Sequence, residues 1–219
     1  MPSILDVDEH ELLYMLHREE LMTRNLYRFY LYIVVVALLI FVMVIFGQVL
    51  QTLLALTPLR ASYTAVPSSA SITQSLVLAL ASWVIAGVLG GLHYWLIRRD
   101  MRNEPTASTS AIRSFFLNIP EAIAIILAVS TFGFLVISTY AANALVGSTG
   151  SLAFAIPTLL LAIILELERR RTPTGAGLAL TFRRLNLYGV QFFLLIFLII
   201  CWLQNVRPLV GSLIYASLQ

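Results

Sequence analysis

Lysine is absent from this chain of 219 residues, so all fourteen of its basic side chains are arginine. Charge of either sign is scarce as well, because charged residues make up only 11% of the sequence and hydrophobic residues 59%. The mean hydropathy is +0.89. A soluble globular domain has about 25% charged residues. The composition therefore excludes a water-soluble domain and predicts the lipid bilayer as the protein's surroundings.

The small basic excess does not indicate a nucleic-acid partner. The formal net charge is +3, but the arginines stand beside apolar runs and form no continuous patch that could follow a phosphate backbone. We expect no nucleic-acid partner.

Cysteine occurs once, at Cys201, inside an apolar run. A single cysteine excludes an intrachain disulfide and a thiolate metal cluster, and the apolar surroundings predict a buried, unreactive side chain. A cleavable signal peptide is not expected either, because six acidic residues precede the first long apolar run. They are Asp6, Asp8, Glu9, Glu11, Glu19 and Glu20.

Enzyme signatures are missing too. The sequence has no Walker loop, no dinucleotide-binding glycine pattern and no histidine–glutamate zinc motif. Gly147-Ser-Thr-Gly150 has the composition of a serine-nucleophile loop, but no histidine is predicted on its side of the membrane to act as a base. We therefore expect no enzymatic activity, no cofactor and no metal site.

Five long apolar runs are present instead. About 20 mostly apolar helical residues cross a bilayer, and the continuous runs lack the polar–apolar alternation of membrane barrel strands. The fold class predicted is an all-α integral membrane bundle. The expected spans are Leu31–Leu50, Leu76–Ile97, Ile119–Ala141, Ser151–Leu165 and Leu187–Leu203. The fourth is short and contains Pro157.

Arginine placement supports five spans and predicts their direction. Twelve arginines precede the first span or lie in the second-to-third and fourth-to-fifth connections, whereas only Arg60 and Arg207 lie on the other side. The positive-inside rule then places the N-terminus in the cytoplasm and the C-terminus outside. We expect a bacterial inner (plasma) membrane.

Two further helix boundaries can be predicted. Residues 8–22 indicate an amphipathic helix on the membrane surface, with a soluble arm as the alternative. At Asn118-Ile-Pro-Glu121, an asparagine precedes a proline and a glutamate at the spacing of a helix N-terminus. That pattern predicts that the third span begins at Ile119.

Self-comparison indicates repeated helical hairpins. Arg24-Asn-Leu-Tyr27, Arg113-Ser-Phe-Phe116 and Arg184-Leu-Asn-Leu-Tyr188 each introduce an outward span. We divide the chain into an N-terminal interfacial helix (1–23), a first hairpin (24–112), a second hairpin (113–182) and one arm of a third (183–219). Because the third unit lacks its returning helix, either the number of spans is odd or the chain continues beyond Gln219. We favour the second explanation.

The exit of the second span, Gly91-Leu-His-Tyr-Trp-Leu-Ile-Arg-Arg-Asp100, together with the preceding Arg24-Asn-Leu-Tyr27, resembles a family of uncharacterised bacterial multi-pass membrane proteins. The resemblance is best over residues 24–113. The second unit departs from it, with Ile164 where His93 would align. The resemblance implies a repeated helical membrane domain and no established activity.

Small residues line one face of the second span and lead to His93. They are Ala79, Ser82, Ala86 and Gly90, with Gly87 and Gly91 beside them. Such residues let helix backbones approach closely, so this face is predicted to pack on another helix. His93 is interpreted as a structural side chain at the end of that seam; a proton-relay or ligand role, or a haem or metal ligand, are the alternatives.

Four more sets of polar or anchoring residues are candidates. Glu121 is predicted to close the Asn118 cap, and Glu166 to pair with nearby arginines at the membrane boundary. If His93, Glu121 and Glu166 converged, they could form a proton or cation site. Gln191 is predicted to hydrogen-bond between helices. The interface anchors expected are Trp95, Arg98, Arg99, Arg169, Arg170 and Arg171.

These observations predict a non-enzymatic structural or accessory subunit of a membrane assembly, which would associate with partner subunits or with itself. A small transporter or an ion or proton channel is the first alternative, because repeated hairpins and broken helices are typical of transporters. A membrane sensory module is the second.

Overall fold

The computed structural model describes residues 9–61, 65–142 and 147–203, and this part of the chain is helical without strands. The five long helices are α1 (Glu9–Leu54), α2 (Ser69–Asn103), α3 (Ala111–Ala142), α4 (Thr149–Arg170) and α5 (Leu178–Cys201). A short 3-10 helix, η1 (Pro105–Thr109), joins α2 to α3. All five long helices are long and apolar enough to cross a membrane. In lipid every backbone polar group must be paired within the chain, which is why apolar runs of this length form helices.

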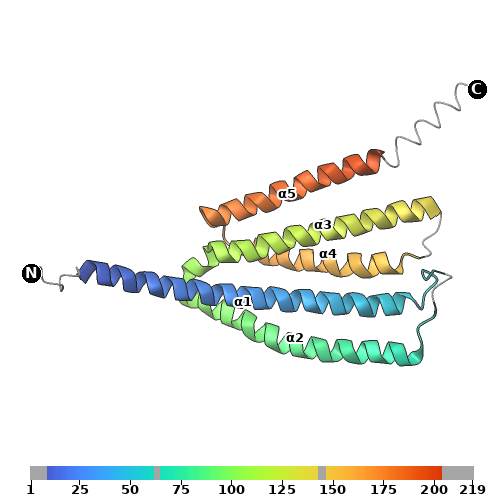
Figure 1. The fold of residues 1–219 in the computed structure, drawn as a ribbon, viewed down its shortest axis with the longest axis horizontal. Coiled ribbons are helices and arrows are strands. Elements are labelled where there is room, and N and C mark those ends of the chain that lie inside the picture. Colours follow the sequence, from blue (N-terminus) through green and yellow to red (C-terminus); the bar gives the residue numbers. More distant parts are fainter. Residues whose placement is uncertain (1–8, 62–64, 143–146, 204–219) are drawn as a thin grey trace, which may run out of the picture.

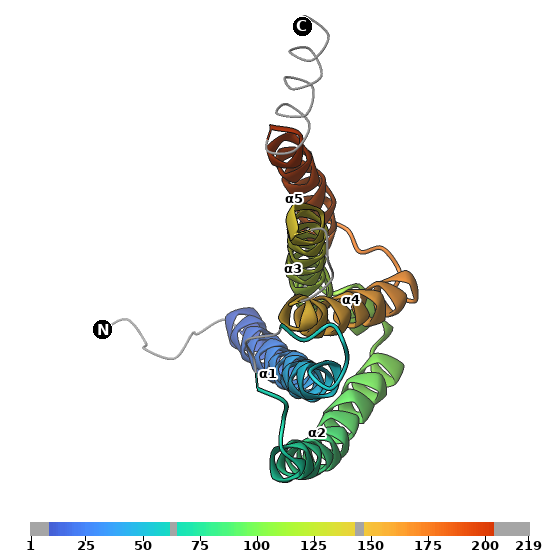
Figure 2. The same ribbon diagram turned by 90° about the vertical axis from the view of Figure 1, so that its right-hand side faces the viewer.

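The helices run alternately in opposite directions along one bundle axis (Figure 1). The strongest pairings join α1 to α2 and α3 to α4, and α1 also packs on α4. α2 and α5 lie at opposite edges (Figure 2). The two predicted hairpins are therefore present as packed pairs, whereas their origin as repeats stays a prediction. Arg207 and most of the third unit's second half lie outside the described residues.

The alternation of helices brings the arginines of α1, α2, α3 and α4 to one end of the bundle, which we call the arginine-rich end. Its apolar support is a cluster of Leu31, Tyr32, Ile97 and Phe116, where α1, α2 and α3 meet. A second cluster joins α3 to α4. It contains Leu117, Ala124, Leu161, Ala162 and Leu165. Most other large apolar side chains face outwards, as expected of helices whose outer surface meets lipid.

The predicted N-terminal helix is continuous with the first span. α1 contains 46 residues, which corresponds to about 69 Å at 1.5 Å per residue. The segment before Arg24 therefore extends along the axis of the span (Figure 1). Asp8 lies outside the described residues.

The predicted start of the third span at Ile119 is wrong. α3 begins at Ala111, and Asn118 and Pro120 lie inside it. Ser110 occupies the capping position instead, because its Oγ accepts the backbone N–H of Arg113 at 3.3 Å. Asn118 is buried and donates to the Ser114 carbonyl at 2.7 Å. The cap-like spacing at Asn118–Glu121 thus occurs within a helix whose real cap lies two turns earlier.

Pro157 does not shorten the fourth span, because α4, which contains 22 residues in all, runs through this position without a break. Proline lacks the N–H that would bond the carbonyl four residues earlier, and that carbonyl belongs to Ala153. A Cβ on Gly47 of α1 would lie 2.8 Å from the Ala153 oxygen. Gly47 therefore permits the close approach of α1 to α4 at the proline.

Candidate functional site

The charged side chains of α2, α3 and α4 gather at the arginine-rich end. Each of the five acidic residues between positions 100 and 168 forms an ion pair with an arginine. They are Asp100, Glu104, Glu121, Glu166 and Glu168. Three clusters result, and each joins side chains from different helices.

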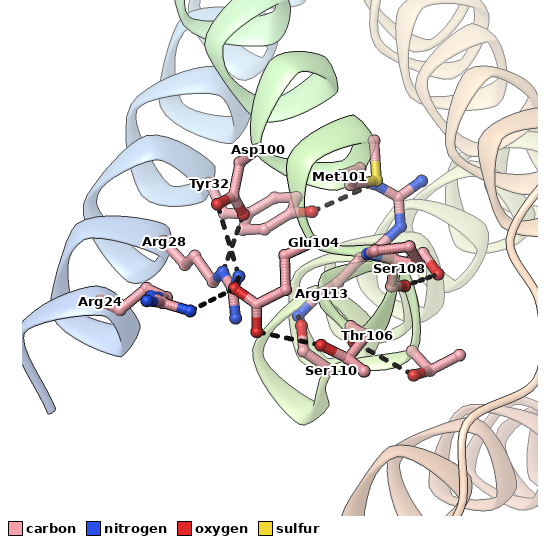
Figure 3. A network of polar contacts seen from close by, with 12 residues as sticks. Arg24, Arg28, Tyr32, Asp100, Met101, Glu104, Thr106, Ser108, Ser110 and Arg113 are labelled. Carbon is pink, nitrogen blue, oxygen red and sulfur yellow. Dashed lines mark hydrogen bonds and ion pairs between the residues drawn. The ribbon is translucent and has the colours of Figure 1, made fainter. Parts of the chain in front are cut away.

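The first cluster joins α1 to the end of α2 (Figure 3). Arg24 and Arg28 lie one turn apart on α1, opposite Asp100 and Glu104, which share the same spacing. Arg28 Nε lies 2.8 Å from the Asp100 carboxylate, and its Nη2 lies 2.6 Å from Glu104 Oε2. Arg24 Nη1 reaches the same Glu104 oxygen at 2.6 Å. Two arginines and two carboxylates therefore clamp these helices together.

Glu104 lies in the turn between α2 and η1, and its carboxylate contacts both arginines of this cluster. The Thr106 hydroxyl donates to its other carboxylate oxygen at 3.0 Å. This hydrogen bond, together with those from Arg24 and Arg28, holds the pKa of the Glu104 carboxyl below its ordinary value. The carboxylate is therefore the favoured form, and it pins the η1 turn to α1.

The second cluster is built around Arg113 of α3, which is only 3% exposed. Its guanidinium donates to the Tyr32 hydroxyl of α1 at 3.0 Å, to Glu168 Oε1 of α4 at 2.6 Å, and to the Thr172 hydroxyl at 2.9 Å. The Tyr32 ring stacks on Phe116. Arg113 is therefore a buried charge with a carboxylate partner and hydroxyl acceptors, and it joins three helices.

Glu168 receives a second arginine from α2. Arg98 Nη2 lies 3.1 Å from Glu168 Oε2, and the Tyr94 hydroxyl donates to the same oxygen at 3.3 Å. The Arg98 guanidinium also lies over the Tyr94 ring, 5.1 Å from its centroid. One carboxylate on α4 thus holds arginines from both α2 and α3.

The third cluster joins α3, α4 and α5 around Glu121, which is 2% exposed. Its Oε2 accepts the Asn186 side-chain amide at 2.8 Å and lies 3.0 Å from Arg169 Nε. Arg169 also pairs with Glu166, which accepts Arg170 Nε at 2.6 Å as well. The predicted role of Glu121 as the closure of an Asn118 cap is therefore wrong: α3 passes through this position, and the carboxylate bonds to neighbouring helices.

The proton or cation site considered from the sequence depends on the convergence of His93, Glu121 and Glu166, and the structure brings only the two glutamates together. Glu121 and Glu166 share Arg169, whereas His93 lies elsewhere, on α2. Its Nδ1 lies 2.7 Å from the Leu89 carbonyl, so Nδ1 carries the hydrogen, and Nε2 faces the Tyr30 hydroxyl at 3.4 Å. His93 is thus held by its own helix and by α1.

The small-residue face of α2 divides into two parts. Ala79, Ser82 and Ala86 are buried, and a Cβ on Gly90 would meet Leu38 of α1 at 3.8 Å. A Cβ on Gly87 or Gly91, in contrast, would meet nothing within 4 Å. The first part belongs to the α1–α2 contact, and the two outer glycines border open space.

The remaining candidates lie at the surface. Gln191 is exposed on α5, and within the described residues its side chain forms no hydrogen bond. Trp95 is exposed beside Arg99, whose guanidinium lies 5.6 Å from the Trp95 ring centroid. Arg170 and Arg171 end α4, where arginines complement the helix dipole.

Sequence reasoning missed the clamps formed by Arg28 with Asp100 and by Arg113 with Glu168. The first had a signal, because two arginines and two acids are each spaced by four residues and lie at the same predicted end. No sequence pattern pointed to the second contact. The third span was expected to begin at Ile119, which left Arg113 outside the predicted helix, whereas α3 begins at Ala111.

Comparison with known proteins finds no matching family model, no matching curated protein and no matching solved structure. The resemblance of residues 24–113 to uncharacterised bacterial membrane proteins stays a prediction.

Proposed function

We propose that this chain is a non-enzymatic integral membrane protein that serves as a structural or accessory subunit of a membrane assembly, and that α5 provides its contact. The observation that carries the proposal is the position of Gln191. We place the assembly in a bacterial inner membrane, and the arginine distribution supports a cytoplasmic location of the arginine-rich end.

α5 packs on α3 along one stripe. Asn186 bonds to Glu121, and the Phe197 ring lies on Gly133 of α3, where a Cβ would be 2.0 Å from the ring. At 100° per residue, Gln191 falls on the opposite side of the helix from Asn186 and Phe197. The exposed face around Gln191 also holds Leu195 and Leu198. We call these three residues the α5 outer face.

Gln191 lies seven residues beyond Arg184, or about 10 Å deeper along the helix. A primary amide in hydrocarbon without a hydrogen bond is unfavourable. Glutamine on a transmembrane helix is therefore stabilised by a partner on a neighbouring helix. Such a partner is not present in the described part of the chain, so a second molecule would supply it.

We propose that this second molecule is another copy of the same chain. The glutamine side chain has both a donor and an acceptor, so two copies of Gln191 can pair with each other across a two-fold axis. Leu195 and Leu198 would pack beside the pair. A leucine at position 191 keeps the volume but removes the hydrogen bonds.

The test is Förster transfer between donor- and acceptor-labelled protein in liposomes, measured over a range of protein-to-lipid ratios. We expect transfer that saturates for the native chain and is lost for Gln191→Leu. Gln74→Leu, which changes an exposed glutamine of α2, is the matched control and should keep the native transfer. Monomeric behaviour of the native chain, or undiminished transfer in Gln191→Leu, would show that the α5 outer face is not the contact.

A small proton or cation transporter is the second candidate, and the burial of Glu121 favours it. Ionisable groups inside membrane proteins often mark ion pathways, and Glu121 lies beside a second carboxylate, Glu166, through their shared Arg169. Proteoliposomes would show flux that falls in Glu121→Ala. Flux that is absent, or is unchanged in Glu121→Ala and His93→Ala, would remove this candidate.

A further inference from the structure

A cavity of about 590 Å³ opens between α2 and α4. Both helices pack on α1, which forms the floor, and diverge from each other beyond it (Figure 2). The walls are apolar over most of their length. They include Val35 and Leu39 of α1, Trp83, Gly87 and Gly91 of α2, and Ile164 of α4.

Two glycines keep this cavity open. Gly87 and Gly91 lie one turn apart on α2, and a Cβ on either would meet nothing within 4 Å. With side chains at both positions, the wall would project into the space. Among the described residues, no other helix approaches these glycines, so they do not serve a close helix contact there.

The end of the cavity nearest the arginine-rich end is polar. Tyr94, Arg113, Glu168 and Arg171 line it. Arg98 lies beside these residues, where it forms an ion pair with Glu168. Three arginines and one glutamate leave a net charge of +2 at this end. Arg171 is exposed and forms no ion pair with any described residue.

We propose that this cavity binds one anionic phospholipid, with an acyl chain along the apolar walls and the phosphate beside Arg171 and Arg98. The apolar walls of the cavity suit an acyl chain, and its arginine-containing end suits a phosphate group. Basic pockets between transmembrane helices on the cytoplasmic side bind anionic head groups, and the net charge disfavours the extra cation of a zwitterionic head group. The site lies on the far side of α3 from α5, so it does not depend on the proposed self-association (Figure 2).

Trp83, in the wall, allows a direct test. We would replace Trp95 and Trp202 with phenylalanine and reconstitute the protein in phosphatidylcholine containing a minor fraction of phosphatidylglycerol brominated near the methyl end of one acyl chain, the depth expected for Trp83 from its position along α2. Bromine quenches tryptophan fluorescence on contact. We expect stronger quenching than when the same fraction of brominated phosphatidylcholine is present in an otherwise identical bilayer.

Two variants locate the site. Arg171→Gln should lower the apparent preference for the anionic lipid about fivefold, because an arginine near the surface contributes about 1 kcal/mol to anionic-lipid attraction. Arg99→Gln removes a neighbouring charge that does not line the cavity and should keep the preference. Gly87→Leu should reduce quenching by both lipids, whereas Val88→Leu, on an exposed part of the same helix, should not.

Equal quenching by the two brominated lipids in the Trp83-only protein would overturn the proposal, because it would show that lipid fills the cavity without recognition of its charge. A similar effect of Arg99→Gln and Arg171→Gln would also overturn it by showing a general surface attraction. Undiminished quenching in Gly87→Leu would place the bound lipid outside the cavity.

Discussion

Arg113 of α3 and Glu168 of α4 meet at 2.6 Å inside the bundle, with side chains only 4% and 16% exposed. Arg98 of α2 and Tyr32 of α1 complete the contact, so four helices converge on this pair. Removal of one partner from a buried pair leaves an uncompensated charge, which is far more unfavourable than the loss of an exposed pair.

Glu168→Leu should therefore lower the free energy of unfolding by about 3–5 kcal/mol. The variant leaves Arg113 buried with only hydroxyl and sulfur acceptors. Unfolding of the detergent-solubilised protein by dodecyl sulfate, followed by circular dichroism, measures the change. Glu20→Leu, which removes an exposed partner of Arg24, should change stability by less than about 1 kcal/mol. Equal effects of the two variants would contradict a structural role for the buried pair.

Gly47→Ala should weaken the contact between α1 and α4 by about 1–3 kcal/mol, the usual effect of overpacking. The added methyl group would meet the Ala153 carbonyl, a backbone atom that cannot move aside without shifting the helix. The same unfolding assay applies.

Gly87→Ala is the matched control for this prediction. No atom lies within 4 Å of its added Cβ, and alanine favours helix over glycine by about 1 kcal/mol. We expect stability that is unchanged or slightly increased. A loss in Gly87→Ala as large as that in Gly47→Ala would show that glycine is needed on these helices for a reason other than close approach.

The α1–α2 clamp should weaken in acid through Glu104. Its pKa is lower in the folded protein than in the unfolded chain, so its contribution to stability is present above the unfolded pKa, about 4.3 for an ordinary glutamate. This contribution is lost as the pH falls through the lower, folded pKa. Stability measured over this pH range should fall less steeply in Glu104→Gln.

The control for the acid effect is Glu20→Gln, which removes a carboxylate that contacts Arg24 alone. It should keep the native pH profile. If the profile of Glu104→Gln matched the native one as well, the acid sensitivity of the protein would arise at other groups.

Cysteine labelling tests the orientation that the arginines predict. In a Cys201→Ala background, Arg102→Cys should resist an impermeant thiol reagent added to intact cells and react after lysis. Val66→Cys, exposed in the connection at the other end of the bundle, should react in intact cells. The reverse labelling pattern would show that the arginine-rich end faces the outside of the cell, contrary to the prediction.

The sequence by itself determined that this protein is helical and has five apolar segments, because lipid leaves a continuous apolar run no other way to pair its backbone. It also determined which end collects the arginines, since alternate connections must lie on the same side. The sequence did not determine where each helix begins. Asn118 and Ser110 both have side chains that can cap a helix, and only packing decided that Ser110 does so while Asn118 is buried.

Only the tertiary structure decided the partners of the charges. Glu121 and Asn186 are 65 positions apart, and Arg113 and Glu168 are separated by 55, so their contacts depend on how three helices rotate about their axes. A hydrophobic run almost equally apolar on all sides does not specify that rotation. The close approach of Gly47 to Ala153 and the open space beside Gly87 depend on the same rotation, which is set when side chains of different helices pack together.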